Sequence, residues 1–197
     1  VTIMERVTRR NPEDADSAAL LAECHVTAGV LLSSRKEGGT GDALAAFEKA
    51  RAVRERLAQR DPADVQLQRG LAECHMHTGI VLRDDAGDLA GARRNLEKAL
   101  GIVQLLADSN PADLPNRAWL CDFWANLARL ARAEKSAEKE LAAWEKMREI
   151  SEAISRGAPD NLDYLQYRYR HPRESTRSEQ ATGAARPGKS LCKQAAV

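Results

Sequence analysis

One pentapeptide occurs twice in this chain, and its spacing constrains the fold more than any other feature. Leu21-Ala22-Glu23-Cys24-His25 returns unchanged at residues 71–75. A second signal, an Asn or Asp followed by Pro, begins at Asn11, Asp61 and Asn110. A fixed period of about 50 residues is the mark of a repeat array, in which each unit buries its apolar face against its neighbours.

Each repeat predicts a pair of antiparallel helices, A and B. Helix A is expected to begin at a proline, with its N-cap at Asn11, Asp61 and Asn110. The acids three positions after the cap, which would face the positive end of the helix dipole, are Asp14, Asp64 and Asp113. Apolar spacing predicts helix A over 62–83 and 111–132 and helix B over 136–155, with turns at 36–41 and 84–88.

These signals divide the chain into a series of units. Residues 1–10 align with the end of a helix B, so we expect them to be the remnant of a preceding repeat, either because the chain is a piece of a longer protein or because its reading frame is truncated. Residues 11–171 are predicted to hold three helix-pair repeats (11–60, 61–109 and 110–157) and a partial fourth helix A. Residues 172–197 lose the apolar periodicity and are expected to form a disordered basic tail.

Composition supports a helical scaffold. Aromatic residues make up 4% of the chain and charged residues 30%, which suits a helical array better than a β-sandwich or barrel. The net charge is +1, so no global field favours a nucleic acid or a membrane surface. There is no run of 18 apolar residues and no signal-peptide pattern, and the four cysteines indicate free thiols. We therefore expect a cytoplasmic location.

A family pattern runs through the three units. Its positions are filled in unit one by His25, Ala28, Gly29, Leu32, Ala43, Phe47, Ala50 and Pro62. Unit two supplies His75, Thr78, Gly79, Leu82, Ala92, Leu96, Ala99 and Pro111, and unit three supplies Trp124, Leu127, Ala128, Ala131, Glu140, Trp144, Met147 and Pro159. This pattern resembles an extended tetratricopeptide repeat. The resemblance implies an all-α fold, a right-handed α-solenoid of antiparallel helix pairs, and a non-enzymatic interaction scaffold.

In that family, helix A lines a concave groove that binds the partner. The residues that the resemblance places there are Glu23, Val26, Val30, Ser33, Glu73, Met76, Ile80, Arg83, Asp122, Ala125, Arg129 and Arg132. Their mixed charge favours an extended peptide held by carboxylate and guanidinium contacts. We expect a protein or peptide partner in this groove, and no membrane, small-molecule substrate, metal or cofactor.

Two other functions stay open at this point. The phrase Leu-Ala-x-Cys/Ser-His-x-x-x-Gly is similar to arrays that follow bacterial serine/threonine kinase domains of the Hanks type. That similarity implies a regulatory C-terminal region whose catalytic domain lies outside this chain. Nucleic-acid binding would need a basic groove with interleaved aromatic residues, and the acids Glu23, Glu73 and Asp122 at one repeated position argue against it.

Three motifs imitate sites of other kinds. Residues 183–190 match the phosphate-loop pattern, but they lack the preceding strand and following helix that phosphate binding needs, so we expect no nucleotide binding. Cys24-His25 and Cys74-His75 imitate metal ligands, but equivalent positions in stacked repeats lie too far apart, so we expect Cys24, Cys74 and Cys121 to be packing residues. We expect Trp124 and Trp144 in the core, whereas the position of Trp119 has no counterpart that explains it.

Overall fold

The computed structural model describes residues 1–11, 13–35 and 38–158, and over these ranges the chain is all-helical, as the repeat pattern predicts. The helices are α1 (Thr2–Arg10), α2 (Ala15–Ser33), α3 (Gly39–Arg60), α4 (Val65–Asp84), α5 (Leu89–Ser109), α6 (Leu114–Ala133) and α7 (Ala137–Gly157). Residues 159–197, which hold the remainder of the predicted fourth helix A and the basic tail, lie outside the described residues.

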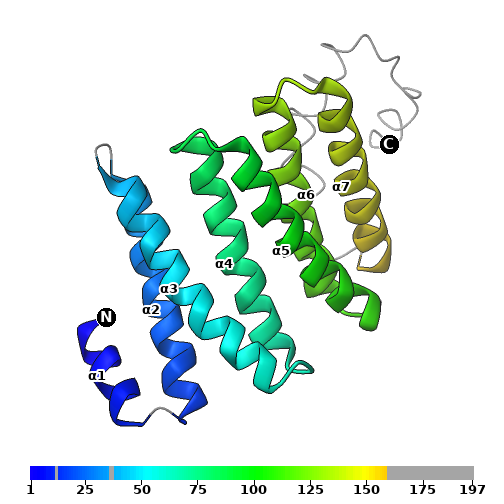
Figure 1. The fold of residues 1–197 in the computed structure, drawn as a ribbon. Helices are drawn as coiled ribbons and strands as arrows, with labels where there is room; N and C mark the ends of the chain where they lie inside the picture. Colours follow the sequence, from blue (N-terminus) through cyan, green and yellow to red (C-terminus); the bar gives the residue numbers. More distant parts are fainter. Residues whose placement is uncertain (12, 36–37, 159–197) are drawn as a thin grey trace, which may run out of the picture.

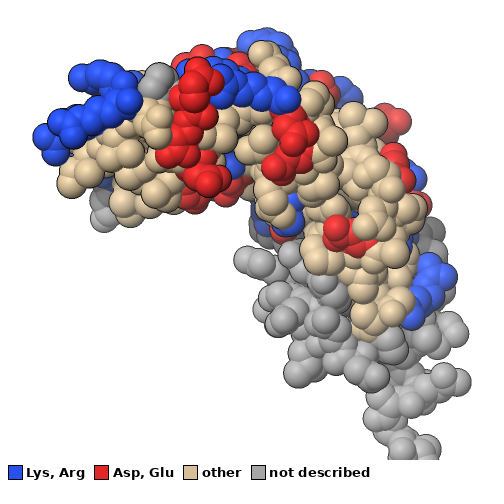
Figure 2. Space-filling model, turned by 90° about the horizontal axis from the view of Figure 1, so that it is seen from below, with Lys and Arg blue, Asp and Glu red and all other residues tan. Residues whose placement is uncertain are grey.

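The helices stack in sequence as antiparallel neighbours (Figure 1). Each described helix packs against the next one along the chain. In addition, α2 contacts α4 and α4 contacts α6, whereas no such contact joins the described helices α3, α5 and α7 to one another. We therefore call α2, α4 and α6 the inner layer and α3, α5 and α7 the outer layer of the arched molecule (Figure 2).

The inner helices begin about one turn later than the sequence predicts. Their N-caps are Asp14, Asp64 and Asp113. The Asp64 carboxylate, for example, accepts hydrogen bonds from the backbone N–H groups of Gln66 and Leu67 at 2.7 and 3.1 Å. The predicted N-caps, Asn11, Asp61 and Asn110, are instead the C-caps of α1, α3 and α5. The prediction was wrong because each repeat boundary holds two Asn or Asp residues, three positions apart, that can cap a helix. The backbone N–H of the second residue donates to the carbonyl of the first, and this hydrogen bond closes a turn before the helix starts.

The turns between inner and outer helices share one backbone feature. Each contains a residue with positive φ at the same repeat position: Gly38 at 71°, Gly87 at 69° and Lys135 at 59°. Glycine adopts this conformation without steric cost, whereas lysine does not. The turn of the first pair is also shorter than the predicted 36–41, because α3 already begins at Gly39.

Small residues bring the two layers close together. Gly29 on α2 faces Phe47, and a Cβ atom at Gly29 would lie 2.6 Å from Cε1 of that ring. Gly79 on α4 faces Leu96 in the same way, with 2.8 Å to Cγ. On the outer helices the predicted close-approach residues Ala50 and Ala99 are fully buried. Phe47, Leu96 and Trp144 therefore form the centre of three successive apolar contacts between layers.

Among the described helices, α2 is long and apolar enough to cross a membrane by length and composition. Its most apolar 18-residue window has a mean hydropathy of 1.3, and 33% of that window is buried. Charged residues, among them Asp16 and Glu23, interrupt this helix, so it contains no continuous run of 18 apolar residues. A core helix of a helical array passes the same test, and α2 packs here against α1, α3 and α4.

Candidate functional site

The inner layer carries the residues that the family resemblance places in a binding groove. Glu23, Val30 and Arg132 are exposed, and Ser33, Glu73, Met76, Ile80, Asp122 and Arg129 are partly buried. Val26 and Ala125 are buried, at 3% and 1% exposure. The expectation that Val26 and Ala125 are open to a partner is wrong, because contacts between successive inner helices cover them; Val26, for instance, shares a core cluster with Cys74 and Val81 of α4.

An arginine from the outer layer joins the acids of the first two inner helices. The guanidinium Nη2 of Arg54, on α3, lies 2.6 Å from Oε2 of Glu23 and 3.7 Å from Oε2 of Glu73. The side chain of Arg54 is 13% exposed, whereas that of Glu23 is 53% exposed. The hydrogen bond with His77 lowers the pKa of Glu73, burial opposes this shift, and the charge of Arg54 lowers the pKa further. The two carboxylates thus flank one largely buried guanidinium.

Gly70 makes room for this arrangement. The Arg54 guanidinium crosses α4 at Gly70, where a Cβ atom would overlap it. At the next junction the residues at the same two repeat positions are Val103 and Trp119. There the outer helix contributes a short, fully buried side chain and the inner helix a large one, which packs edge-on against Phe123 at a ring-centroid distance of 5.6 Å. This exchange explains Trp119, which repeat alignment alone left without a role.

Two of the predicted groove arginines already hold structural contacts. The Arg83 side chain is 6% exposed, and its Nη1 donates to the backbone carbonyl of Asn126 at 3.2 Å, which ties α4 to α6. Its Nε also donates to Asp84 at 2.6 Å. Arg132 pairs with the buried Glu140 at 2.6 Å. The expectation that Arg83 is available to a peptide is therefore wrong, because its polar atoms are used in stacking the helices.

Burial shifts the pKa values of Cys74, Cys121 and His75. Burial raises the pKa of the Cys74 thiol and of the Cys121 thiol to about 12, so both remain protonated at neutral pH. Burial also lowers the pKa of His75, whose Nδ1 lies 2.9 Å from Oδ1 of Asn95. Over the described ranges, no three His, Cys, Asp or Glu side chains are grouped to hold a metal ion. The phosphate-loop match at 183–190 lies outside those ranges.

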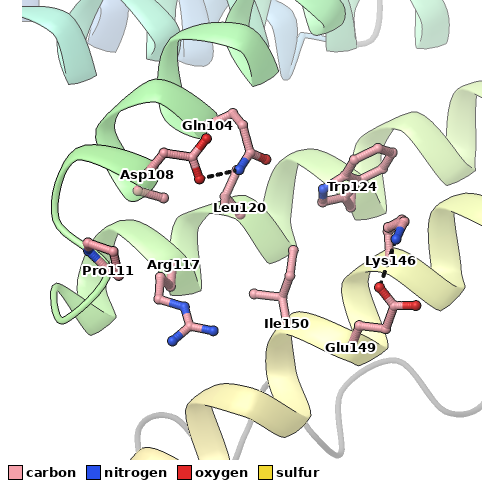
Figure 3. A pocket seen from close by; sticks show the side chains of 10 residues that line it. Gln104, Asp108, Pro111, Arg117, Leu120, Trp124, Lys146, Glu149 and Ile150 are labelled. Atoms are coloured by element: carbon pink, nitrogen blue, oxygen red, sulfur yellow. Dashed lines mark hydrogen bonds and ion pairs between the residues drawn. The ribbon is translucent and has the colours of Figure 1, made fainter.

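A groove runs along the outer layer between α5 and α7, with α6 as its floor. It consists of two cavities of about 620 and 570 Å³ that share Trp124, Lys146 and Glu149 as lining residues. Figure 3 shows the first cavity, bounded by Gln104 and Asp108 from α5 and by Ile150 from α7. Trp124, which we expected in the core, is only partly buried because it lines both cavities. We call this feature the α5–α7 groove.

The equivalent junction between α3 and α5 is polar. There Arg51 bonds to Glu48 at 2.6 Å and to Glu55 at 3.3 Å along α3. The buried His75 of α4 contacts Asn95 of α5, and the charge of Arg51 contributes to the lowered pKa of His75. In the α5–α7 groove, the residues at the repeat positions of Arg51, His75 and Asn95 are Leu100, Trp124 and Ala143. Three polar side chains have thus been replaced by apolar ones that line a single cavity.

Sequence reasoning placed the candidate residues on the inner layer and missed this outer groove. The signal was present in the repeat alignment, since Leu100, Trp124 and Ala143 each replace a polar residue of the preceding unit.

Comparisons with family models, with curated proteins and with solved structures find no match to this chain.

Proposed function

We propose that this chain is a protein–protein interaction scaffold, a right-handed α-solenoid of the tetratricopeptide type whose inner layer binds an extended peptide. The observation that carries the proposal is the row of acids at one repeat position on successive inner helices: Glu23, Glu73 and Asp122. A peptide that crosses these helices would meet one carboxylate per unit. An extended strand of about 3.3 Å per residue spans a pair of helices about 9 Å apart in roughly three residues.

The first two units define the chemistry of the partner most sharply. Arg54 holds Glu23 and Glu73 in place, so that their carboxylates need little further ordering when a ligand binds. Val30 is 40% exposed, about two turns along α2 from Glu23, and adds an apolar contact. These groups favour a peptide with basic side chains spaced about three residues apart and an apolar residue beside them.

A selection from a library of extended 10-residue peptides tests this proposal. We expect binders rich in Lys and Arg, and we expect the Glu23→Gln, Glu73→Gln double variant to bind them at least tenfold more weakly. Glu48→Gln is the matched control, because Glu48 is also paired with an arginine but lies on the outer layer. Unchanged affinity in the double variant, or equal losses in both variants, would contradict an inner-layer site.

The similarity to arrays behind Hanks-type kinase domains supports a second proposal, that the scaffold is the regulatory region of a longer kinase chain. The two proposals are compatible, because a regulatory array also works by binding peptides. Reading the gene upstream of Val1 tests the second one directly. A reading frame that continues without any kinase motif would reject it and leave the peptide-binding proposal in place.

A further inference from the structure

We propose that the α5–α7 groove is a second docking site, separate from the inner layer, that receives an amphipathic α-helix of a partner protein. Its floor is an apolar stripe on α6 formed by Leu120, Trp124 and Leu127, spaced four and three residues apart. Trp124 is the partly exposed member of the stripe, whereas Leu120 and Leu127 are largely buried. Such a stripe runs parallel to the helix axis and matches the apolar stripe of a second helix laid along it. Leu100 from α5 and Ile150 from α7 complete the apolar walls.

The dimensions favour a helix over a small ligand. The lining extends along α5 from Arg93 to Asp108, which at 1.5 Å per residue is about 22 Å. A helix of four turns has about the same length. A compact small molecule would fill one of the two cavities, whereas an elongated ligand can occupy both of them, which share Trp124 as a lining residue.

Helix stacking does not account for the apolar floor. The junction between α3 and α5 has the same packing partners in the same order, and there Arg51, His75 and Asn95 occupy the corresponding positions. The polar set is thus compatible with stacking. The partly exposed side chains of Trp124 and Leu100 would gain free energy if a partner covered them. Their presence where the α3–α5 junction has His75 and Arg51 therefore indicates binding.

The charges on the groove walls argue for a partner stripe without net charge. On α7, Nζ of Lys146 lies 2.8 Å from Oε2 of Glu149. On α5, Arg93 bonds to Glu97 at 3.2 Å and also to Glu134 at the end of α6. These pairs cancel one another, so the walls attract neither a polyanion nor a strongly basic segment. A helix with one apolar face, flanked by acidic and basic residues in equal number, complements such a groove.

A display library supplies the test. The probe is a set of 16-residue, Ala-rich helical peptides with equal numbers of Glu and Lys and with randomised apolar residues at i, i+3, i+4, i+7 and i+11. Peptides that bind the full chain and peptides that bind its Leu100→Arg variant are selected from this library in parallel. Arginine already stands at this repeat position in α3, and Glu97 lies three residues before position 100, as Glu48 lies three residues before Arg51. Circular dichroism and the urea midpoint verify that the variant folds, and Trp124→His serves as a second variant if it does not.

We expect the full chain to enrich peptides that bind the variant at least tenfold more weakly and that shift the indole N–H resonance of Trp124 more than that of the buried Trp144. Arg51→Leu should leave their affinity unchanged. The proposal is overturned if no peptide is enriched over the variant, or if sequence-scrambled peptides bind equally well. It is also overturned if the Leu100→Arg substitution abolishes self-association of the chain at the concentrations used, which would make a second copy the occupant. If the selected peptides bind the Glu23→Gln, Glu73→Gln double variant with the same affinity as the unsubstituted chain, this site is separate from the inner layer.

Discussion

Arg54 and Gly70 share one space at the junction of the first two helix pairs. The guanidinium of Arg54, on α3, occupies the volume that a Cβ atom at Gly70, on α4, would fill. From this position it reaches Glu23 and Glu73 on two different inner helices. A residue of the outer layer therefore sets the charge arrangement of the inner face, and it does so only because its neighbour has no side chain.

The Gly70→Ala substitution tests this relationship. In a helix interior the change normally stabilises the fold by about 0.5–1 kcal/mol. Here we expect it to be neutral or destabilising, because the methyl group displaces the Arg54 guanidinium from both acids. In an Arg54→Ala background the normal gain should return. Urea unfolding of the four proteins gives the coupling free energy, which we expect to be about 1 kcal/mol or more; additive effects would show that the two residues do not share this space.

Lys135 is the one non-glycine residue in the row of positive-φ turn positions. Replacing it with glycine, as in the other two turns, should raise the free energy of unfolding by about 1 kcal/mol because the left-handed conformation is costly for a side chain. The reverse change, Gly87→Ala, should lower it by a similar amount. Thermal and urea unfolding measure both, and a destabilising Lys135→Gly would mean that the lysine side chain makes a contact worth more than the strain.

Ala99 lies fully buried where α5 packs against its neighbours. Ala99→Leu should overpack this contact and lower the free energy of unfolding by about 1–3 kcal/mol. Gly101→Ala is the matched control on the same helix, because a Cβ atom there meets nothing within 4 Å, and we expect a small gain in stability. A neutral urea midpoint for Ala99→Leu would show that the predicted repeat register is wrong.

His75 should make stability depend on pH. Burial lowers its pKa in the folded state below the usual value of 6.5, so the unfolded chain takes up the proton first as the pH falls. Its contribution is therefore complete above about pH 7 and is lost as the pH falls through 6.5 toward the folded-state pKa, with a slope of at most about 1.4 kcal/mol per pH unit. Urea unfolding between pH 7.5 and 5.5 should show a flatter dependence for His75→Gln. His25, whose pKa burial also lowers, would supply the remaining slope.

Local patterns predicted the helices well. The all-helical fold is confirmed, and the helix predicted over 62–83 is observed as Val65–Asp84. Apolar periodicity succeeds here because each described helix packs mainly against the helices next to it along the chain, so that each helix face is dictated by nearby sequence. The cap positions failed because two Asx residues compete at each boundary, and their hydrogen bonds depend on backbone geometry that the letters do not contain.

The sequence by itself determined the repeat period, the helical class and the small residues at which layers approach. The tertiary structure alone decided which of the repeated positions stay accessible. Val26 and Arg83 follow the same spacing as Glu23 and Ile80, yet packing between successive inner helices buries the first two side chains. Likewise, Leu100, Trp124 and Ala143 lie far apart in the chain and form one groove only when α5, α6 and α7 pack together. Burial depends on the sum of contacts from several helices, and no single stretch of sequence carries that sum.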